Sequence, residues 1–440
     1  MKLINFIKKQ ALDIESYKLK ELFRKLYILI KFLLNIPILI LAIIPCIFIR
    51  IISPLMIIRV QQIPSGNFGD FVQLTAMYYC KKKLNIDQPK KKYLDLLYIH
   101  HNDKIFNKQL AKMWKRKLNF FSSYLLDPIS RVNKLLPNWK LYTIEFLYKK
   151  RERDINNIFE KCKPLEFTNE EENKGKEILK KFGLNDNDKF ICLAVRDESY
   201  QYKKISKRYR NWDYHDFRHA DVDNFKLAAE ELAKLGYFVF RMGVVAKKPF
   251  NLNNYKIIDY VNSDLRSDFM DIYLGAKCSF CISTDYGFQD LPCLFGKPMI
   301  QIGVPLGGLF SYNEKYLLMT KHHMSKKEKR KLSLSEIFSH GVAYSYYSKD
   351  FAQKEIELIE NSPEEIKDLA IEMVERLESK KTLSSEDKKL QKTFRSLYAL
   401  NIKYYNYKKI SESLSNITMH GEIRSSFGTK FLRENKNWLK

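Results

Sequence analysis

The sequence predicts an α/β fold, with parallel strands and helices arranged as two domains that face each other across a cleft, after a hydrophobic amino-terminal segment. Three observations predict it. From residue 190 onward, short apolar runs alternate with helical segments, which is the rhythm of a parallel sheet covered by helices. A strand, a glycine-containing loop and a helix also follow one another over residues 55–82. Before them, residues 32–49 form an apolar run of 18 residues without a charge.

The amino-terminal run leaves two alternatives open. It reaches the minimum length of a membrane-spanning helix, but prolines interrupt it and follow it, and spanning helices tolerate such breaks only where other groups satisfy the freed carbonyls. A tilted or re-entrant element in the membrane interface is therefore the rival to a simple span. We expect residues 1–58 to be a monotopic anchor, with the body of the protein on the cytoplasmic face. The prolines are Pro37, Pro45 and Pro54.

The composition indicates a folded protein with anionic partners. The 440 residues are 45% hydrophobic, which leaves room for two or three domains. Lys and Arg number 77 against 51 Asp and Glu, a net charge of +26. This excess favours anionic membrane lipids or phosphorylated substrates, although genomic base composition is an alternative cause, and no motif for nucleic acid is present. Seven scattered cysteines fit reduced thiols in a cytosolic compartment.

The first predicted domain covers residues 59–165. An apolar run at 55–60 predicts a strand, and the periodicity of 71–82 predicts a helix after a tight polar loop. A second strand is expected at 93–99, and His100 follows it directly.

The loop before the first helix carries a candidate catalytic group. Asn67, Gly69 and Asp70 lie there, immediately before the predicted helix. A carboxylate at this place could remove the proton of an acceptor hydroxyl held in the cleft. An ordinary helix cap is the alternative for Asp70, because Asp favours that position.

The second predicted domain covers residues 166–375, and residues 376–440 are expected to form a helical, basic and exposed tail. Gly236 ends one predicted helix, since glycine is a common terminator. A Gly-Lys-Pro turn precedes the final strand, which ends at Gly303. The elements expected from apolar runs and periodicity are strands at 190–196, 237–243, 256–261 and 280–282 and helices at 169–182, 224–235 and 267–276.

Polar residues follow four of these strands, and ligands of open α/β sheets bind at the carboxyl ends of the strands. Guanidinium groups suit a diphosphate because each can hold two phosphate oxygens, and a helix that begins near Phe288 could direct free amides at an anion. The alternative is that Arg196 and Asp197 only pair with each other and that Asp285 only caps a helix. The candidates are Arg196, Asp197, Arg241, Gly243, Asp264, Ser283, Thr284, Asp285 and Gly287.

No metal site or cofactor is expected. The sequences Asp186-Asn187-Asp188 and Asp221-Val222-Asp223 have the DxD spacing of metal-dependent glycosyltransferases, but neither follows a strand. The phosphate-binding and hydrolase motifs GxxxxGK[ST], HExxH and GxSxG do not occur.

Several segments resemble bacterial surface-polysaccharide glycosyltransferases of the GT-B type, which have two Rossmann-like domains. The resemblance covers about residues 190–303 and extends to residues 57–74. It rests on FICLAVRDESY, YHDFRHADVDNF, YFVFRMG, IIDYVNSDLRSDFMDIYLGAKCSFCIST, LFGKPMIQI and IIRVQQIPSGNFGDFVQL.

Two remoter families are similar as well. Heptosyltransferases share the Gly69-Asp70 pair, the Asp285-x-Gly287 segment and the Gly-Lys-Pro strand, and this similarity implies Asp70 as the catalytic base. Their histidine after the D-x-G segment is Asp290 here, a departure at a phosphate-binding position. Polysaccharide pyruvyltransferases carry a GNxGD loop that residues 66–70 resemble equally well.

The resemblance implies an inverting, metal-independent glycosyltransferase at the bacterial inner membrane. A nucleotide-diphosphate sugar would be the donor, and a lipid-linked or cell-surface glycan would be the acceptor. Asn67, Gly69 and His100 would lie on the acceptor side, and Asp290 would join the donor-side residues. Pyruvyl transfer from phosphoenolpyruvate and a non-catalytic, membrane-bound scaffold remain the alternatives.

Overall fold

The structure is a computed structural model, and its description covers residues 19–99, 105–145, 153–154, 156–197, 199, 213–284, 287–345, 347–379, 382–404 and 422–440. The chain divides into two compact units. The first comprises Met1–Ile63, Pro89–His101 and Asn119–Tyr148, and the second comprises Pro64–Gln88, Asn102–Leu118 and Lys149–Lys440. The predicted boundaries near residues 165 and 375 are not borders of these units, and the division into two Rossmann-like domains stays a prediction.

The first unit is a small α/β assembly. Strands β1 and β2 pair in parallel, with Arg59 opposite Asp95. These two buried side chains form an ion pair with 2.6 Å between Nε and Oδ1. The strands expected at 55–60 and 93–99 are thereby confirmed. The elements are α2 (Leu19–Leu41), α3 (Ile43–Ile52), β1 (Ile57–Gln62), β2 (Tyr93–Tyr98), α6 (Ser123–Asn133) and η2 (Trp139–Tyr142).

The apolar amino-terminal run is helical in this unit. Pro37 lies inside α2, and Ala42 separates α2 from α3. By length and composition, Leu33–Ile52 could cross a membrane, with a mean hydropathy of 2.4, and 17% of its most apolar stretch is buried. Signal sequences and core helices meet the same criterion.

The second unit is built on a parallel sheet of seven strands. Their order is β12-β8-β7-β6-β3-β4-β5, and every neighbouring pair is parallel. The predicted parallel α/β sheet is therefore confirmed for this unit. The strands are β3 (Phe190–Ala194), β4 (Phe238–Arg241), β5 (Ile257–Ile258), β6 (Cys281–Ser283), β7 (Met299–Val304), β8 (Tyr316–Thr320) and β12 (Ser426–Phe427).

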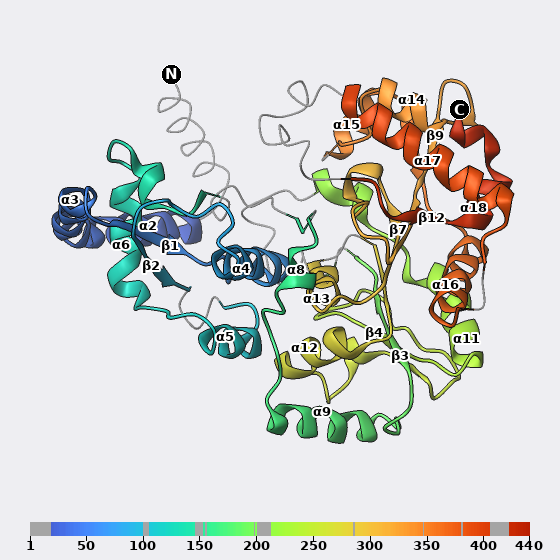
Figure 1. The fold of residues 1–440 in the computed structure, drawn as a ribbon, viewed down its shortest axis with the longest axis horizontal. Helices are drawn as coiled ribbons and strands as arrows, with labels where there is room; N and C mark the ends of the chain where they lie inside the picture. The colour runs from blue at the N-terminus through green and yellow to red at the C-terminus, as the bar shows by residue number, and fades with distance from the viewer. Residues whose placement is uncertain are drawn as a thin grey trace. The chain divides into compact units, whose positions relative to one another are not determined.

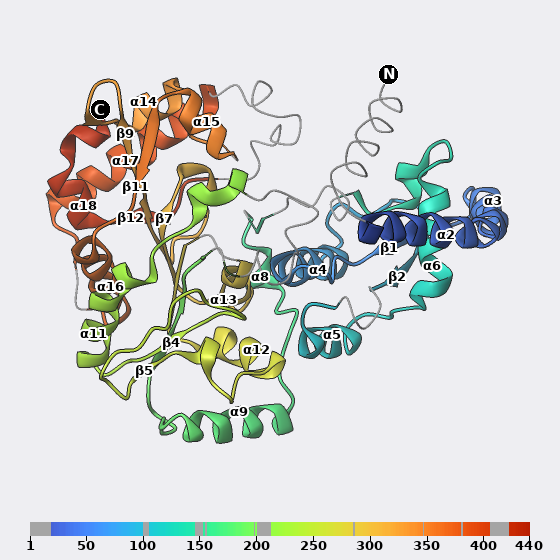
Figure 2. The same cartoon turned by 180° about the vertical axis from the view of Figure 1, so that it is seen from behind.

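Helices cover both faces of this sheet. Figures 1 and 2 show α11 and α16 on one side and α12 and α13 on the other. The helices of the unit are α4 (Phe68–Lys83), α5 (Lys108–Lys115), α8 (Ile158–Lys161), α9 (Asn169–Lys181), α11 (Lys226–Lys234), α12 (Asp268–Lys277), α13 (Asp290–Leu294), α14 (Leu334–Ser339), α15 (Ser348–Gln353), α16 (Pro363–Leu377), α17 (Ser385–Tyr404) and α18 (Thr429–Glu434). Short 3-10 turns join them, namely η3 (Asp213–Arg218), η4 (Val222–Phe225), η5 (Tyr260–Asn262), η6 (Gly287–Gln289), η7 (Leu306–Gly308) and η11 (Lys436–Leu439).

Local sequence explains where several helices begin. Thr168 accepts the backbone N–H of Glu171, whose carboxylate accepts the N–H of Thr168 in return, so both free donors at the start of α9 are satisfied. The pair Ser362 and Glu365 forms the same capping box at α16. These caps set the amino ends of helices that the apolar pattern alone places only approximately.

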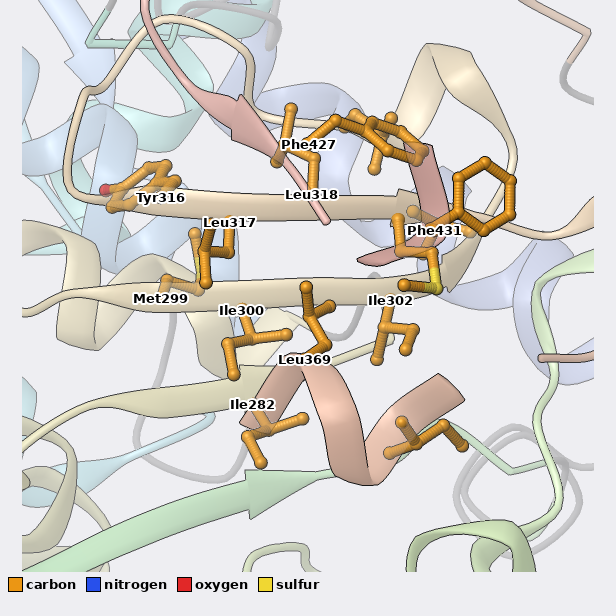
Figure 3. Packing of buried hydrophobic residues seen from close by; sticks show 14 of the residues in the cluster. Ile282, Met299, Ile300, Ile302, Tyr316, Leu317, Leu318, Leu369, Phe427 and Phe431 are labelled. Carbon is orange, nitrogen blue, oxygen red and sulfur yellow. The ribbon is translucent and has the colours of Figure 1, made fainter. Parts of the chain in front are cut away.

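The main core fills the space between the sheet and its helices. Figure 3 shows Ile282, Ile300 and Leu317 from neighbouring strands beside Leu369 of α16. The strands read as continuous apolar runs because a parallel sheet is buried on both faces.

The carboxyl-terminal region differs from the expectation of an exposed tail. Residues 422–440 return to the sheet, where β12 pairs with β8, and Phe427, Leu432 and Trp438 are buried. That part of the expectation was wrong, because these large apolar side chains complete the core at the edge of the sheet. A second small antiparallel sheet was not predicted, with strand order β10 (Arg330–Lys331), β9 (His322–Ser325) and β11 (Ile356–Ile359).

Candidate functional site

The order of the strands singles out one place on the carboxyl edge of the sheet. All seven strands point the same way, but the chain adds β4 and β5 on one side of β3 and adds β6, β7 and β8 on the other side. The order of the strands therefore reverses between β3 and β6, and ligands of doubly wound sheets bind in the crevice at such a reversal. The residues that follow β3 and β6 are therefore the first candidates for binding.

Two predicted residues meet at this reversal. The hydroxyl of Thr284, after β6, accepts the backbone N–H of Arg196, after β3, at 2.8 Å. Beside it, Ser283 is fully buried, and its hydroxyl has no hydrogen-bond partner among the described residues. Thr284 thus joins the two strand ends, whereas the buried hydroxyl of Ser283 is left without a protein partner among the described residues.

Arg241 lies at the end of β4 and is buried. Its Nη1 donates to the carbonyl of Lys248 at 2.6 Å and to Oδ1 of Asp259 at 3.3 Å, and its Nη2 lies 3.8 Å from Oδ2 of Asp197. The guanidinium therefore binds protein groups on several sides. Asp197 also accepts the backbone N–H groups of Ser199 and Lys247, each at 2.9 Å.

A cavity of about 270 Å³ opens at the ends of β3 and β4. Asp221 and Asp223 of the second DxD sequence both accept from Nζ of Lys248, at 2.8 and 2.9 Å. The Lys248 ammonium holds the pKa of the Asp221 carboxyl below its usual range. The ammonium of Lys226, followed by that of Lys248, does the same for the pKa of Asp223. The cavity is lined by Val195, Asp197, His219, Ala220, Asp221, Val222, Arg241, Lys247, Lys248 and Glu360.

The candidate base lies in the first turn of α4. The helix begins at Phe68, earlier than the predicted residue 71, so Asp70 is inside the helix and Asn67 is the capping residue. The helix-cap alternative for Asp70 is not what the structure shows. Nδ2 of Asn67 donates to Oδ2 of Asp70 at 3.2 Å, and this carboxylate is half-buried.

Within the same unit, the first turn of α4 packs against the segment that follows β6. The rings of Phe68 and Phe288 stack with 6.2 Å between centroids, and Phe106 covers Phe68 from another side at 5.5 Å. These aromatic contacts bring Gly69 and Asp70 next to η6 and α13.

Gly69 and Asp290 are in close contact there. A Cβ atom at position 69 would lie 2.3 Å from Oδ2 of Asp290 and 3.3 Å from the carbonyl oxygen of Gly287. A larger side chain at position 69 would have to displace this carboxylate. Because the amino end of a helix carries partial positive charge, it favours a carboxylate at that position, which gives Asp290 a physical role where heptosyltransferases have histidine.

The remaining predicted residues are Gly243, Asp264, His100 and Asp285. The carbonyl of Gly243 accepts Nε of Arg266 at 2.9 Å. Asp264 is exposed in the turn before α12, because β5 ends at Ile258, earlier than the predicted residue 261. His100 and Asp285 lie outside the described residues.

Sequence reasoning missed two charged residues at strand ends. Asp259 directly follows β5 and binds Arg241, and the early end of the apolar run at Ile258 was its signal. Lys321 follows β8, a strand that was not predicted although residues 316–320 are an apolar run. Its buried Nζ donates to the carbonyl of His219 at 2.5 Å, and burial lowers the pKa of this lysine.

Comparisons with known proteins show only remote similarity. No protein-family model and no curated protein matches the chain. A glycosyl transferase of family 9 from Veillonella parvula DSM 2008 has a TM-score of 0.41 and 12% identity, over 74% of this chain and 98% of that one. The ADP-heptose LPS heptosyltransferase II of E. coli has a TM-score of 0.31 and 13% identity, over 60% of this chain and 90% of that one. Similarity of this degree does not assign an activity to this chain.

Proposed function

We propose that the protein is a glycosyltransferase that takes a sugar from a nucleotide-diphosphate donor and passes it to a lipid-linked or cell-surface glycan. The contact between Gly69 and Asp290 carries the proposal. Asp70 is the next residue along α4, so this contact brings the first turn of α4 to the segment that follows β6. A general base beside a nucleotide-type crevice is the arrangement that direct glycosyl transfer requires.

In the proposed reaction, the carboxylate of Asp70 takes the proton of the acceptor hydroxyl. The hydroxyl oxygen bonds to the anomeric carbon from the face opposite the leaving group, so the configuration inverts. The bond from that carbon to the diphosphate oxygen breaks, and the diphosphate leaves with the electron pair. Cationic and hydrogen-bonding groups beside the departing oxygen stabilise the negative charge that develops on it.

Among the residues at the carboxyl edge, we assign the diphosphate to Arg196 and to the Ser283 hydroxyl. Arg241 is enclosed by Asp197, Asp259 and the carbonyl of Lys248, so we assign it to ordering this edge of the sheet. Lys247 is exposed at the cavity and would add positive charge for the donor, whereas Lys248 is bound to Asp221 and Asp223. The proposal includes neither a metal ion nor another cofactor.

The acceptor side of the proposal consists of Asn67, Gly69 and His100. Peripheral or monotopic attachment to the bacterial inner membrane, with the body in the cytoplasm, belongs to the same proposal. It is supported by the apolar residues of α2 and α3 and by the net charge of +26. A lipid-linked acceptor would be held at the same surface.

Nucleotide binding is the first test. Thermal unfolding of the whole chain should be measured with UDP, GDP, CDP and ADP, and with nucleotide sugars of each. A nucleotide at 100 times its Kd should add about 2.7 kcal/mol of stability. Hydrolysis of one donor by the folded protein would support transfer, whereas stabilisation by none of them would indicate a scaffold. Stabilisation by phosphoenolpyruvate alone would indicate pyruvyl transfer.

The second test is Asp70→Asn. Loss of the base should lower the transfer rate by about 10²–10⁴-fold, with donor binding unchanged because the amide has the same shape. Asp186→Asn is the matched control, since this exposed carboxyl lies in the turn before β3, at the amino end of the strand and not at its carboxyl end. Full transfer activity in Asp70→Asn would exclude the assigned base.

A further inference from the structure

Helix α3 lies against the first unit along its whole length. Ala42 and Cys46 pack with Val132 of α6, and Ile49 packs with residues of the sheet. The thiol of Cys46 donates to the carbonyl of Ile129 in α6 at 3.4 Å. One face of α3 is therefore an ordinary protein interface.

The opposite face of α3 is apolar and exposed to solvent. A helix attached to its unit along one side cannot also be surrounded by lipid. Before α3, the uncharged part of α2 spans only residues 32–41, which is about half the length that a crossing requires. The apolar segment therefore fits a position in the membrane interface. Its exposed side chains include Ile44, Ile47, Phe48, Ile51 and Leu55.

Arg50 fastens a second segment to the end of α3. Its Nη2 donates to Oδ1 of Asn133 at 2.9 Å and to the carbonyl of Pro137 at 3.3 Å. The guanidinium also lies over the ring of Tyr142, 4.6 Å from the centroid. These contacts hold residues 134–141, the turn after α6 together with the first residues of η2, beside the carboxyl end of α3.

This turn carries apolar side chains next to exposed cations. Leu135 is 85% exposed and Leu141 is 48% exposed. Lys134 and Lys140 precede these leucines and are exposed as well. Leucine beside lysine suits a membrane surface, where the apolar chain enters the acyl region and the ammonium meets anionic headgroups. Trp139 in the same turn is a residue type enriched at that interface.

We propose that the exposed face of α3 and the 134–141 turn form one monotopic docking surface for a bilayer that contains anionic lipids. Exposed Lys90, Lys91 and Lys92 add to the cationic character of this unit. Asp95 is paired with Arg59 and Asp127 with Arg131, and Glu21 and Glu145 are the other acidic residues in the described part of this unit. The surface is independent of glycosyl transfer, because lipid binding needs no donor or acceptor.

Vesicle binding of the full chain tests the turn. Binding to phosphatidylcholine vesicles with and without 30% phosphatidylglycerol would be compared for wild type, Leu135→Glu/Leu141→Glu and Lys134→Glu/Lys140→Glu. The leucine variant should bind both vesicles at least about tenfold more weakly, since it no longer places two apolar side chains in the acyl region. The lysine variant should lose most of the preference for phosphatidylglycerol. Leu235→Glu, which changes a half-exposed leucine of the second unit, is the control and should bind as wild type.

A fluorescence measurement shows whether the turn enters the bilayer even if α2 and α3 dominate the affinity. Brominated lipids should quench part of the tryptophan emission of the wild type, and Trp139→Phe should abolish that part. Equal quenching in both proteins would overturn the proposal. It would also fail if the surface formed a dimer in solution that did not bind vesicles. If the protein binds vesicles but shows no transferase activity, the lipid-binding proposal stands and the proposed glycosyl transfer fails.

Discussion

At the scale of single residues, Gly69 shows most clearly how sequence-distant groups constrain each other. Its missing side chain makes space for the carboxylate of Asp290 at the amino end of α4. Neither residue signals this contact in the sequence, because it depends on how α4 docks on the segment after β6. The Gly-Asp motif identified the candidate base, but only the structure explains why glycine precedes it.

The double variant Gly69→Ala/Asp290→Ala tests this contact. Gly69→Ala alone should lower stability by about 1–3 kcal/mol, because the new methyl group overlaps Oδ2 of Asp290. In the Asp290→Ala background that cost should become clearly smaller, since the overlapping atom is gone. Denaturant unfolding of the four proteins gives the coupling free energy. Additive effects would mean that the two side chains are not in contact.

A buried carboxyl in the second unit predicts how stability depends on pH. Asp154 accepts the N–H groups of Ile158 at 2.6 Å and Phe159 at 3.1 Å, and burial raises the pKa of its carboxyl to about 6 from 3.8. Between these values the folded protein binds a proton that the unfolded chain does not. The free energy of unfolding should therefore fall as the pH rises from about 4 to 6, by about 3 kcal/mol for this group.

Asp154→Asn removes the titrating group and should flatten this part of the profile. The amide can accept only one of the two N–H groups, which lowers stability by an amount independent of pH. The measurement is thermal unfolding from pH 4 to 7.5 for both proteins. Parallel profiles would contradict the raised pKa.

At the scale of elements, two hydroxyls lie at the junction between β3 and β6, those of Thr284 and Ser283. Thr284→Val should cost about 1–3 kcal/mol, because the N–H of Arg196 loses this acceptor in a buried place. Ser283→Ala should change stability little, since its buried hydroxyl has no protein partner among the described residues. If that hydroxyl binds the donor, Ser283→Ala should weaken nucleotide binding. Calorimetric titration with the nucleotide found above measures the second effect, and unchanged affinity would remove Ser283 from the site.

The carboxyl-terminal elements form an aromatic cluster at the edge of the sheet. The ring of Trp438 lies 4.7 Å from Phe427 and 5.4 Å from Phe431, measured between centroids. Trp438→Ala should lower the free energy of unfolding by about 3–5 kcal/mol, as removal of a buried aromatic side chain does. Leu400→Ala, at a half-exposed position of α17, should stay within about 0.5 kcal/mol of wild type. Equal destabilisation of the two variants would contradict the packing.

Most of the central strands were predictable because burial on both faces leaves continuous apolar runs in the sequence. β3, β4, β6 and β7 were expected from such runs, and their ends differ by only a few residues. β12 gave no local signal, since two residues are too short for any periodicity and their partner β8 is distant in the chain.

The candidate site was likewise predictable only where its residues directly follow apolar runs. Strand-end residues were visible in the sequence, whereas the enclosure of Arg241 by Asp197 and Asp259 depends on how separate loops fold together.

At the scale of the whole molecule, the two units present different chemistry. The first unit carries the exposed apolar residues of α3, and the second carries the parallel sheet with its polar carboxyl edge. Binding to lipid and binding to nucleotide are therefore expected to respond to separate sets of substitutions.

The pairing of β12 with β8 has a consequence for how the chain folds. Ser426 pairs with Leu317, so the outer strand of the sheet is supplied by chain that is synthesised long after its neighbour. Contacts between distant residues form slowly, and until this one forms, β8 is an uncovered edge with free N–H and C=O groups, open to strands of other molecules. Premature termination in the last part of the gene would therefore leave a protein that retains β3 to β8 but is prone to aggregate.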